Sequence, residues 1–213
     1  GLWPMIFVSV VALLLSVRGL AFRKAFGIGY LGGFLFYVSQ IEWMSLYLGP
    51  VPLVALSILE AFFFGLGMAA IAMVWQKLDA SPKLRLRNLT VALAIALIWT
   101  AREWVSTNLP YGGFPWSRLA MSQSESPLAN WVYFGGQPLL TLVIAFIGAL
   151  IAIWLVQSRA TGWRNLNTAV SLAVILALFA IPAFTAIPTE PTNGTMVVAA
   201  VQGNANAGLF ANV

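Results

Sequence analysis

Few side chains in this 213-residue chain could perform chemistry. Histidine and cysteine are absent, so acid–base chemistry falls to Asp, Glu, Lys or Tyr, and the sequence has no thiolate nucleophile, disulfide or cysteine metal site. No GxSxG elbow, phosphate-binding loop, metal-ligand cluster or basic nucleic-acid stripe occurs. The residues therefore argue against a self-contained hydrolase, and we expect no metal, no cofactor and no nucleic-acid partner.

The charged residues with the most suggestive placement lie beside tryptophans, at the ends of two apolar segments. Glu42 precedes Trp43, and Arg102 and Glu103 precede Trp104. A Trp at this level is ordinarily an interface anchor and an Arg beside Glu is ordinarily a structural ion pair, so each pair alone carries little weight. We predict that Arg102 and Glu103 hold the base of the loop that follows, with Glu42 as a further partner.

That loop, residues 111–122, reads YGGFPWSRLAMS. Its helix breakers and large apolar groups include Gly113, Phe114, Pro115 and Trp116. A purely aqueous loop does not favour such aromatics, so we expect the loop to dip into the membrane interface. It could anchor the fold as part of an aromatic belt or guide lipid chains toward a site. Ser122 and Gln123 are expected to shape it through hydrogen bonds.

Glu60 lies near the middle of an apolar segment, where a charged carboxylate is expensive. A functional role is the default interpretation of such a residue. The alternative is a neutral glutamic acid that is hydrogen-bonded to a neighbouring helix. The alternative is slightly favoured, because no second carboxylate or basic partner is recognisable at matching depth.

The elements that must position these residues are apolar segments. The chain is 61% hydrophobic and 8% charged, too little charge for the surface of a water-soluble domain. Segments that approach the roughly 20 residues needed to cross a bilayer are residues 3–17, 25–48, 51–75, 89–105, 131–156 and 166–187. We predict an all-α polytopic membrane bundle with about six transmembrane helices.

The positive charges alternate between the connections of these segments. Three connections hold Arg18, Arg23, Lys24, Lys77, Lys83, Arg85, Arg87, Arg159 and Arg164, and the other two cations, Arg102 and Arg118, flank the loop. By the positive-inside rule the three basic connections are cytoplasmic. The loop at 111–122 and everything after residue 187 are then expected on the outer face.

The glycines of the second segment match the pattern of a dinucleotide-binding loop, but the surrounding sequence does not fit such a loop. Residues 27–32, GIGYLG, satisfy GxGxxG, but no strand precedes them. Gly29 and Gly33 also form a GxxxG, and with Gly65 and Gly67 they are expected to allow close helix packing in lipid.

The composition changes near the end of the chain. A polar, Pro-rich stretch, PTEPTNGT, is followed by MVVAAVQGN, which is typical of one buried strand. We predict a transmembrane helical domain over residues 1–188, then a linker and the first strand of another domain over residues 189–213.

Residues 103–136, EWVSTNLPYGGFPWSRLAMSQSESPLANWVYFGG, resemble a segment of bacterial apolipoprotein N-acyltransferases. That segment reads Glu, a variable stretch, Gly-Phe-Pro-Trp, then Ser-Gln and Pro-Leu. Residues 40–49, QIEWMSLYLG, are similar to the family's earlier outer-end Trp segment, and residues 197–204, VVAAVQGN, to the first strand of its nitrilase-like domain. Order and spacing agree across nearly the whole chain.

The resemblance implies a multi-pass protein of the bacterial cytoplasmic membrane with an extracytoplasmic αββα nitrilase-like domain. That family transfers an acyl chain from phospholipid to the amine of a lipoprotein's diacylglyceryl-cysteine. A Cys attacks the ester, a Glu acts as base and acid, and a Lys stabilises the oxyanion before the thioester is aminolysed. These residues are expected beyond Val213, so no catalytic residue is expected here. The acyl-chain rim is expected to comprise Trp43, Gly113, Phe114, Pro115 and Trp116.

One departure from the family pattern suggests an alternative. Many members have a Lys-Trp pair just after the Val-Gln-Gly strand, where GLFANV offers only Phe210. This divergence is similar to actinobacterial members, some of which are fused to, or work beside, a polyprenol-phosphate mannose synthase. The alternative is a non-catalytic membrane scaffold that anchors or activates that mannosyltransferase, with the basic connection at residues 77–87 docking it or anionic lipid.

Overall fold

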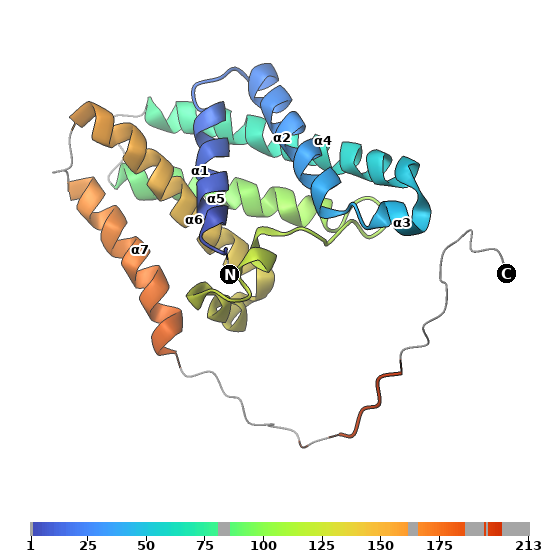
Figure 1. Ribbon diagram of the computed structural model, residues 1–213. Coiled ribbons are helices and arrows are strands. Elements are labelled where there is room, and N and C mark those ends of the chain that lie inside the picture. The colour runs from blue at the N-terminus through green and yellow to red at the C-terminus, as the bar shows by residue number, and fades with distance from the viewer. Residues whose placement is uncertain (1, 81–85, 162–165, 186–193, 195, 202–213) are drawn as a thin grey trace.

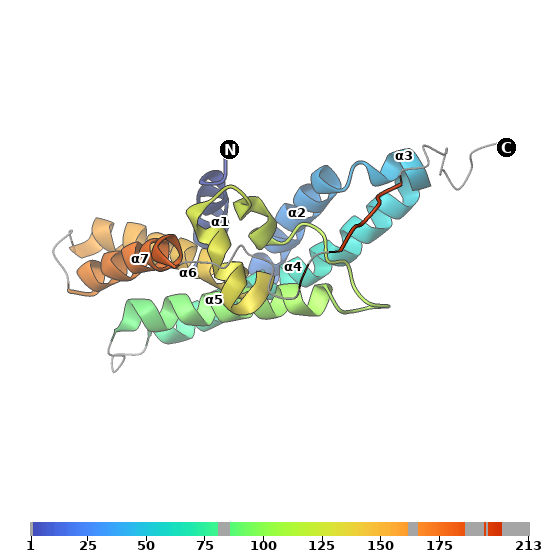
Figure 2. The same cartoon turned by 90° about the horizontal axis from the view of Figure 1, so that it is seen from below.

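The computed structural model describes residues 2–80, 86–161, 166–185, 194 and 196–201. These residues form a helical bundle (Figure 1). Its elements are α1 (Met5–Val17), α2 (Phe22–Gln40), α3 (Met44–Leu48), α4 (Pro50–Asp79), α5 (Arg87–Ser106), the 3-10 helices η1 (Leu119–Gln123) and η2 (Pro127–Asn130), α6 (Trp131–Thr161) and α7 (Leu166–Phe184). Figures 1 and 2 show α7 at the edge of the bundle, beside α6. The prediction of a helical membrane domain is confirmed.

Four helical stretches among the described residues are long and apolar enough to cross a membrane, where the sequence predicts about six. They are Pro50–Asp79, Arg87–Ser106, Pro127–Ser158 and Leu166–Phe184. The apolar helix α1 has 13 residues, fewer than the roughly 20 that a bilayer requires. The helix α2 is not among the four, and its first turn contains Arg23 and Lys24.

The second predicted segment, residues 25–48, is divided in the structure. The helix α2 ends at Gln40, and α3 begins at Met44 after a tight turn. Gly49 then adopts a φ of +81°, which glycine tolerates, and Pro50 begins α4 without an unused N–H. Hydropathy does not reveal this break, because Ile-Glu-Trp at residues 41–43 is compatible with a continuing helix.

Glycines bring α2 against α4, as the GxxxG spacing predicts. A Cβ on Gly29 would lie 2.6 Å from Met68 Cβ, and one on Gly33 would lie 2.8 Å from Phe64 Cβ. Gly65 contacts Phe26 of α2 in the same way. Gly67 makes room for the Arg102 side chain, so it allows close packing against α5 instead of α2. Close packing of this kind is how small residues hold helices together in lipid.

The helix α4 has two contrasting faces. Its exposed apolar residues recur at helical spacing: Val51, Val54, Ile58, Phe62, Leu66 and Met73. The opposite face is buried and includes the two polar residues Ser57 and Glu60. An exposed apolar stripe this long suits contact with lipid chains. With 30 residues, α4 is about 45 Å long, more than the roughly 30 Å of a bilayer core.

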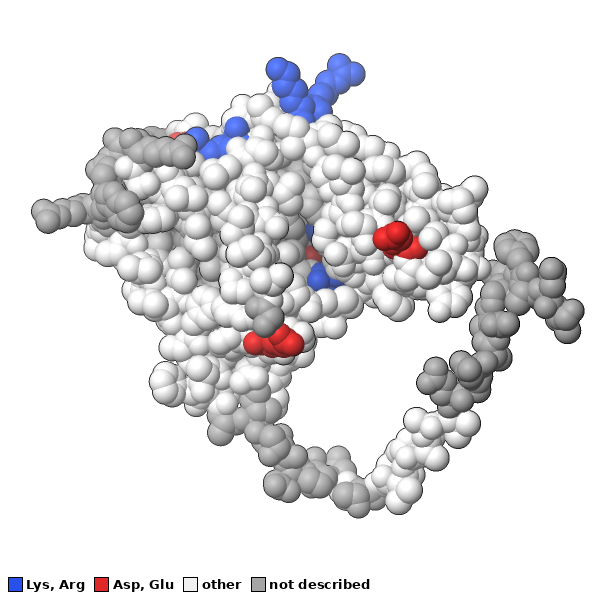
Figure 3. All heavy atoms as spheres, in the orientation of Figure 1, with Lys and Arg blue, Asp and Glu red and all other residues white. Residues whose placement is uncertain are grey.

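One end of the bundle collects basic residues. Asp79, at the end of α4, pairs with Arg18 after α1 at 3.1 Å and with Arg87 of α5 at 3.0 Å. The side chains of Asn88 and Gln157 exchange two hydrogen bonds, which brings the end of α6 to the same place. Figure 3 shows Lys and Arg gathered at this end of the visible face. Lys83, Arg85, Arg164 and the Arg159 side chain lie outside the described residues.

A helix break shapes the opposite end. Within α6 the backbone leaves helical geometry at Gly135 and Gly136, and Gly136 has a φ of +67°. Pro138 follows, where its missing N–H does not interrupt the helix that continues. The break sets Gln137 and Thr141 beneath the loop that follows α5.

The predicted strand lies only partly within the described residues. Residues 196–201 adopt neither helix nor strand, and Val197 and Val201 are exposed. A strand needs a neighbour to satisfy its backbone hydrogen bonds, and none of the described residues supplies one. Most of the predicted linker, residues 202–204 of the strand and Phe210 lie outside the described residues.

Candidate functional site

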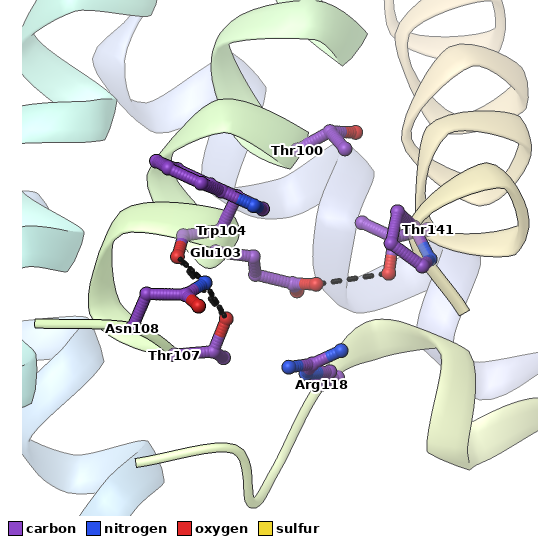
Figure 4. Close-up of a pocket in the computed structure, with 8 residues that line it drawn as sticks. Thr100, Glu103, Trp104, Thr107, Asn108, Arg118 and Thr141 are labelled. Carbon is purple, nitrogen blue, oxygen red and sulfur yellow. Dashed lines mark hydrogen bonds between the residues drawn. The ribbon is translucent and has the colours of Figure 1, made fainter. Parts of the chain in front are cut away.

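The loop after α5 is attached to the bundle through the carboxylate of Glu103. The Leu119 backbone N–H and Trp99 Nε1 donate to Oε1 at 3.1 and 3.3 Å, and the Thr141 hydroxyl donates to Oε2 at 2.8 Å. Figure 4 shows Glu103 and Thr141 pointing toward each other from α5 and α6. Glu103 is buried, so these bonds replace hydration that the carboxylate has lost. The carboxylate therefore joins α5, α6 and the loop.

Arg102 lies near the end of α5, as the sequence predicts, and its side chain is largely buried inside the bundle. Its Nη1 donates to the Tyr37 hydroxyl at 3.3 Å, and its Nη2 lies 3.7 Å from Glu103 Oε1. The guanidinium also lies over the rings of Phe64 and Trp99, with centroids 4.7 and 5.6 Å away. Arg102 is still helical at this point, and its position in α5 turns it toward α2 and α4.

Glu60 has a basic neighbour, Arg102, which is not recognisable from the sequence. It is buried in α4 and faces Arg102, Ser106 and Tyr37. Its Oε2 atom has no hydrogen-bond partner within the described part of the chain. A cation and a tyrosine from two other helices thus meet this carboxylate, which favours its role as a buried junction between α2, α4 and α5.

Three aromatic rings form a cluster beside the loop. The rings of Trp43 and Trp116 are 5.1 Å apart, and those of Phe114 and Trp116 are 6.3 Å apart and nearly parallel. Trp43 is 41% exposed and Trp116 is 51% exposed, whereas Phe114 packs on a small buried group. That group consists of Ile41, Met44 and Leu53. We name Trp43, Phe114 and Trp116 the aromatic rim.

The path of the loop backbone requires glycine at one position of the rim segment. Gly113 has a φ of +70°, and a Cβ there would collide with the backbone of Thr107 and Asn108. The next residue, Phe114, donates its N–H to the Ser106 carbonyl at 2.9 Å. The chain therefore folds back against the end of α5 before it presents the exposed Pro115 and Trp116.

Ser122 and Gln123 hold the far end of the loop. The Ser122 hydroxyl donates to the Leu119 carbonyl at 2.7 Å. Gln123 is fully buried, and its Nε2 donates to Ser122 Oγ at 3.0 Å and to the Trp3 carbonyl at 3.2 Å. This end of the loop is thereby linked to the residues that precede α1.

Glu42 is exposed beside the rim. The contacts of Arg102 come from Tyr37 and Glu103 instead. The structure thus unites Arg102 with Glu103 and Trp43 with Trp116, and it leaves Glu42 in the turn after α2.

Several partners at this site are not predicted from the sequence. Trp99 precedes Glu103 by four residues on one helix, a spacing that could have identified it. Tyr37 and Thr141 gave no such signal, because their contacts depend on how separate helices pack. Arg118 was read only as a loop charge, and it lines a cavity at the base of the loop.

Together these features define a helical membrane domain that carries an aromatic loop at one end. Residues 1–150 match the family model described as apolipoprotein N-acyltransferase N-terminal domain. The chain therefore belongs to the apolipoprotein N-acyltransferase family.

Similar proteins carry that name in several bacteria. The chain is 31% identical over 228 residues to the apolipoprotein N-acyltransferase of Azotobacter vinelandii, which covers 98% of this chain and 40% of the relative. It is 30% identical over 217 residues to that of Vibrio parahaemolyticus, with the same coverage. The chain thus spans about 40% of the length of these curated relatives. Their names give no support to the scaffold alternative.

Proposed function

We propose that this chain forms the membrane domain of an enzyme that transfers an acyl chain from a phospholipid to the N-terminal diacylglyceryl-cysteine of lipoproteins. Family membership and the names of the relatives support this proposal. In this reaction a thiolate displaces a lysophospholipid and forms a thioester, and the lipoprotein amine then forms an amide and releases the thiol. The chain contains no cysteine, so its residues serve the lipid rather than the covalent steps.

The aromatic rim is the observation that carries this assignment. Trp43 and Trp116 are large, half-exposed rings at one end of an apolar bundle. Such rings contact acyl chains on one side and tolerate water on the other. Gly113 and Pro115 set the backbone that presents them. The rim receives an acyl chain and guides it toward the thiol.

The residues beneath the rim keep it in place. Glu103 fixes the start of η1 through Leu119, while Ser122 and Gln123 secure its end. Arg102 neutralises Glu103 from inside the bundle. They are positioning residues, and they act on the lipid through the rim.

The basic end of the bundle faces the cytoplasm, and the rim faces outward in the inner membrane. All six apolar segments lie within the membrane: the four long apolar helices, together with α1 and α2. The residues after 187 lead to an extracytoplasmic nitrilase-like domain. Support for this orientation comes from the cations that gather at the end opposite the loop.

Trp116→Ala in the full-length enzyme tests the rim. We expect thioester formation from phospholipid, followed by intact mass, to slow by about two- to tenfold, the equivalent of one aromatic contact. Phe184→Ala is the matched control, because Phe184 is also exposed at this end of the bundle but lies on α7. An unchanged rate in Trp116→Ala would remove the rim from the proposal.

A further inference from the structure

A cavity of about 240 Å³ lies behind the loop, between the end of α5 and the start of the straight part of α6. Its polar lining consists of Thr100, Glu103, Thr107, Asn108, Arg118 and Thr141. Figure 4 shows the side chains that line the cavity, with Arg118 on the loop side. Trp104 and Pro138 complete the lining, and a few polar groups that converge in a partly apolar cavity indicate a ligand.

Two buried polar atoms in this lining have no partner in the described part of the chain. They are Nε of Arg118 and Oγ1 of Thr100. Arg118 makes one hydrogen bond, from Nη1 to Gln137 Oε1 at 3.3 Å, and no described carboxylate lies within ion-pair distance of it. An arginine with unused donors is suited to hold phosphate oxygens, which its planar group can meet with two donors at once.

The opposite wall of the cavity is negative, and this limits the charge of the ligand. Glu103 is hydrogen-bonded on both oxygens and lies near Arg102, but its charge still faces this space. The carboxyl end of α5 adds partial negative charge there. A dianion is therefore disfavoured, whereas a phosphodiester with one negative charge fits beside Arg118.

We propose that this cavity is a binding site for the phosphodiester of a lipid headgroup, held by Arg118 and Thr100. The cavity is smaller than most drug-sized ligand pockets, so it suits a headgroup and leaves the acyl chains outside. Arg118 is two residues from Trp116, so a phosphate at the arginine places its chains beside the rim. The identification of this lipid as the acyl donor rests on the proposed function, but the binding site itself does not.

Lipid binding to the full-length protein in detergent tests this site. After delipidation, phosphatidylglycerol, diacylglycerol with the same chains, and inorganic phosphate are added separately, and retained ligand is measured by native mass spectrometry. We expect the wild type to retain phosphatidylglycerol at least about tenfold better than diacylglycerol, since one charge-assisted hydrogen bond has about this effect. Inorganic phosphate, which is more highly charged, should bind more weakly than the diester.

Four variants test whether Arg118 binds the headgroup or only attaches the loop. Arg118→Gln should lower phosphatidylglycerol retention to the diacylglycerol level, and Thr100→Val should lower it about two- to fivefold by removing a neutral hydrogen bond. Gln137→Ala removes the one hydrogen bond that Arg118 makes within the described part of the chain but keeps its charge, so it should bind phosphatidylglycerol as the wild type does. Arg23→Gln removes an exposed charge far from the cavity and should have no effect.

Two results would overturn the site. One is wild-type phosphatidylglycerol retention in Arg118→Gln. The other is an equal loss in Arg118→Gln and Gln137→Ala, which would mean that only loop attachment matters. Neither result bears on thioester formation in Trp116→Ala. A failure of the headgroup site can therefore be distinguished from a failure of the acyltransferase assignment.

Discussion

Both ends of the bundle pair an acid with arginine, but the side chains are partly exposed at one end and buried at the other. At the basic end Asp79 lies 3.1 and 3.0 Å from Arg18 and Arg87, with all three side chains about one third exposed. At the loop end the nearest arginine nitrogen is 3.7 Å from Glu103, with both side chains 9% exposed. Exposed pairs contribute little, whereas removal of one member of a buried pair is strongly destabilising.

The shorter ion pairs are therefore expected at the weaker of the two junctions. Glu103 matters because buried donors depend on it, not because of its distance from Arg102. Those donors are Trp99 Nε1, the Leu119 N–H and the Thr141 hydroxyl. Asp79, by contrast, can exchange its partners for water.

The largest expected effect is at Glu103. Glu103→Leu leaves a buried arginine and three donors without their acceptor, so the free energy of unfolding should fall by roughly 3–5 kcal/mol. Equilibrium unfolding in mild detergent measures this loss. Glu103→Gln keeps an acceptor and should lose less. If Glu103→Leu is no worse than a change at Asp79, burial does not distinguish the two ends.

Gly113 should give the next largest effect, because the loop end also depends on a tight backbone fit. Gly113→Ala combines a left-handed φ with a collision against Thr107 and Asn108, and we expect a loss of about 1–3 kcal/mol. Gly112→Ala is the matched control, since Gly112 has a φ of +93° but open space around it. Unfolding of the two variants compares backbone strain with and without the collision. Equal losses would show that the collision is relieved.

Hydropathy and glycine spacing were enough to predict the helical bundle and the contact of α2 with α4. They were not enough to find the break after Gln40, because the residues there suit a helix. They also predicted Arg102 at the outer end of an apolar segment, but not the contacts that its side chain makes inside the bundle. In the structure its side chain contacts Tyr37 and Phe64 from two other helices, together with Trp99 of its own helix.

The candidate site, like the fold, could be predicted only in part from the sequence. The composition of residues 111–122 singled out the loop, and Glu103 could be selected as a carboxylate at its base. The partners that make Glu103 important could not be chosen, because Thr141 comes from α6 and Leu119 donates through its backbone. Local sequence does not encode such contacts.

A smaller effect is expected from the rim, where the rings are half-exposed. In a double-mutant cycle of Trp43→Ala and Trp116→Ala, the coupling free energy should be about 0.5–1.5 kcal/mol, as for other aromatic pairs. The cycle is measured by unfolding and repeated on thioester formation. Coupling in the second assay but not in the first would mean that the rings cooperate on lipid rather than on stability. No coupling in either assay would contradict the contact.

The smallest effect belongs to Asp79, although its two ion pairs are the shortest in the described residues. Asp79→Asn removes the charge and keeps the shape, so we expect a loss of roughly 0.2–1 kcal/mol at low salt. That loss should shrink as ionic strength rises, because water and ions reach all three side chains. Unfolding at low and high salt measures both quantities, with Glu103→Gln as the buried counterpart whose loss should change little. A large, salt-independent loss at Asp79 would show that the basic end is a buried junction too, and the contrast between the two ends would disappear.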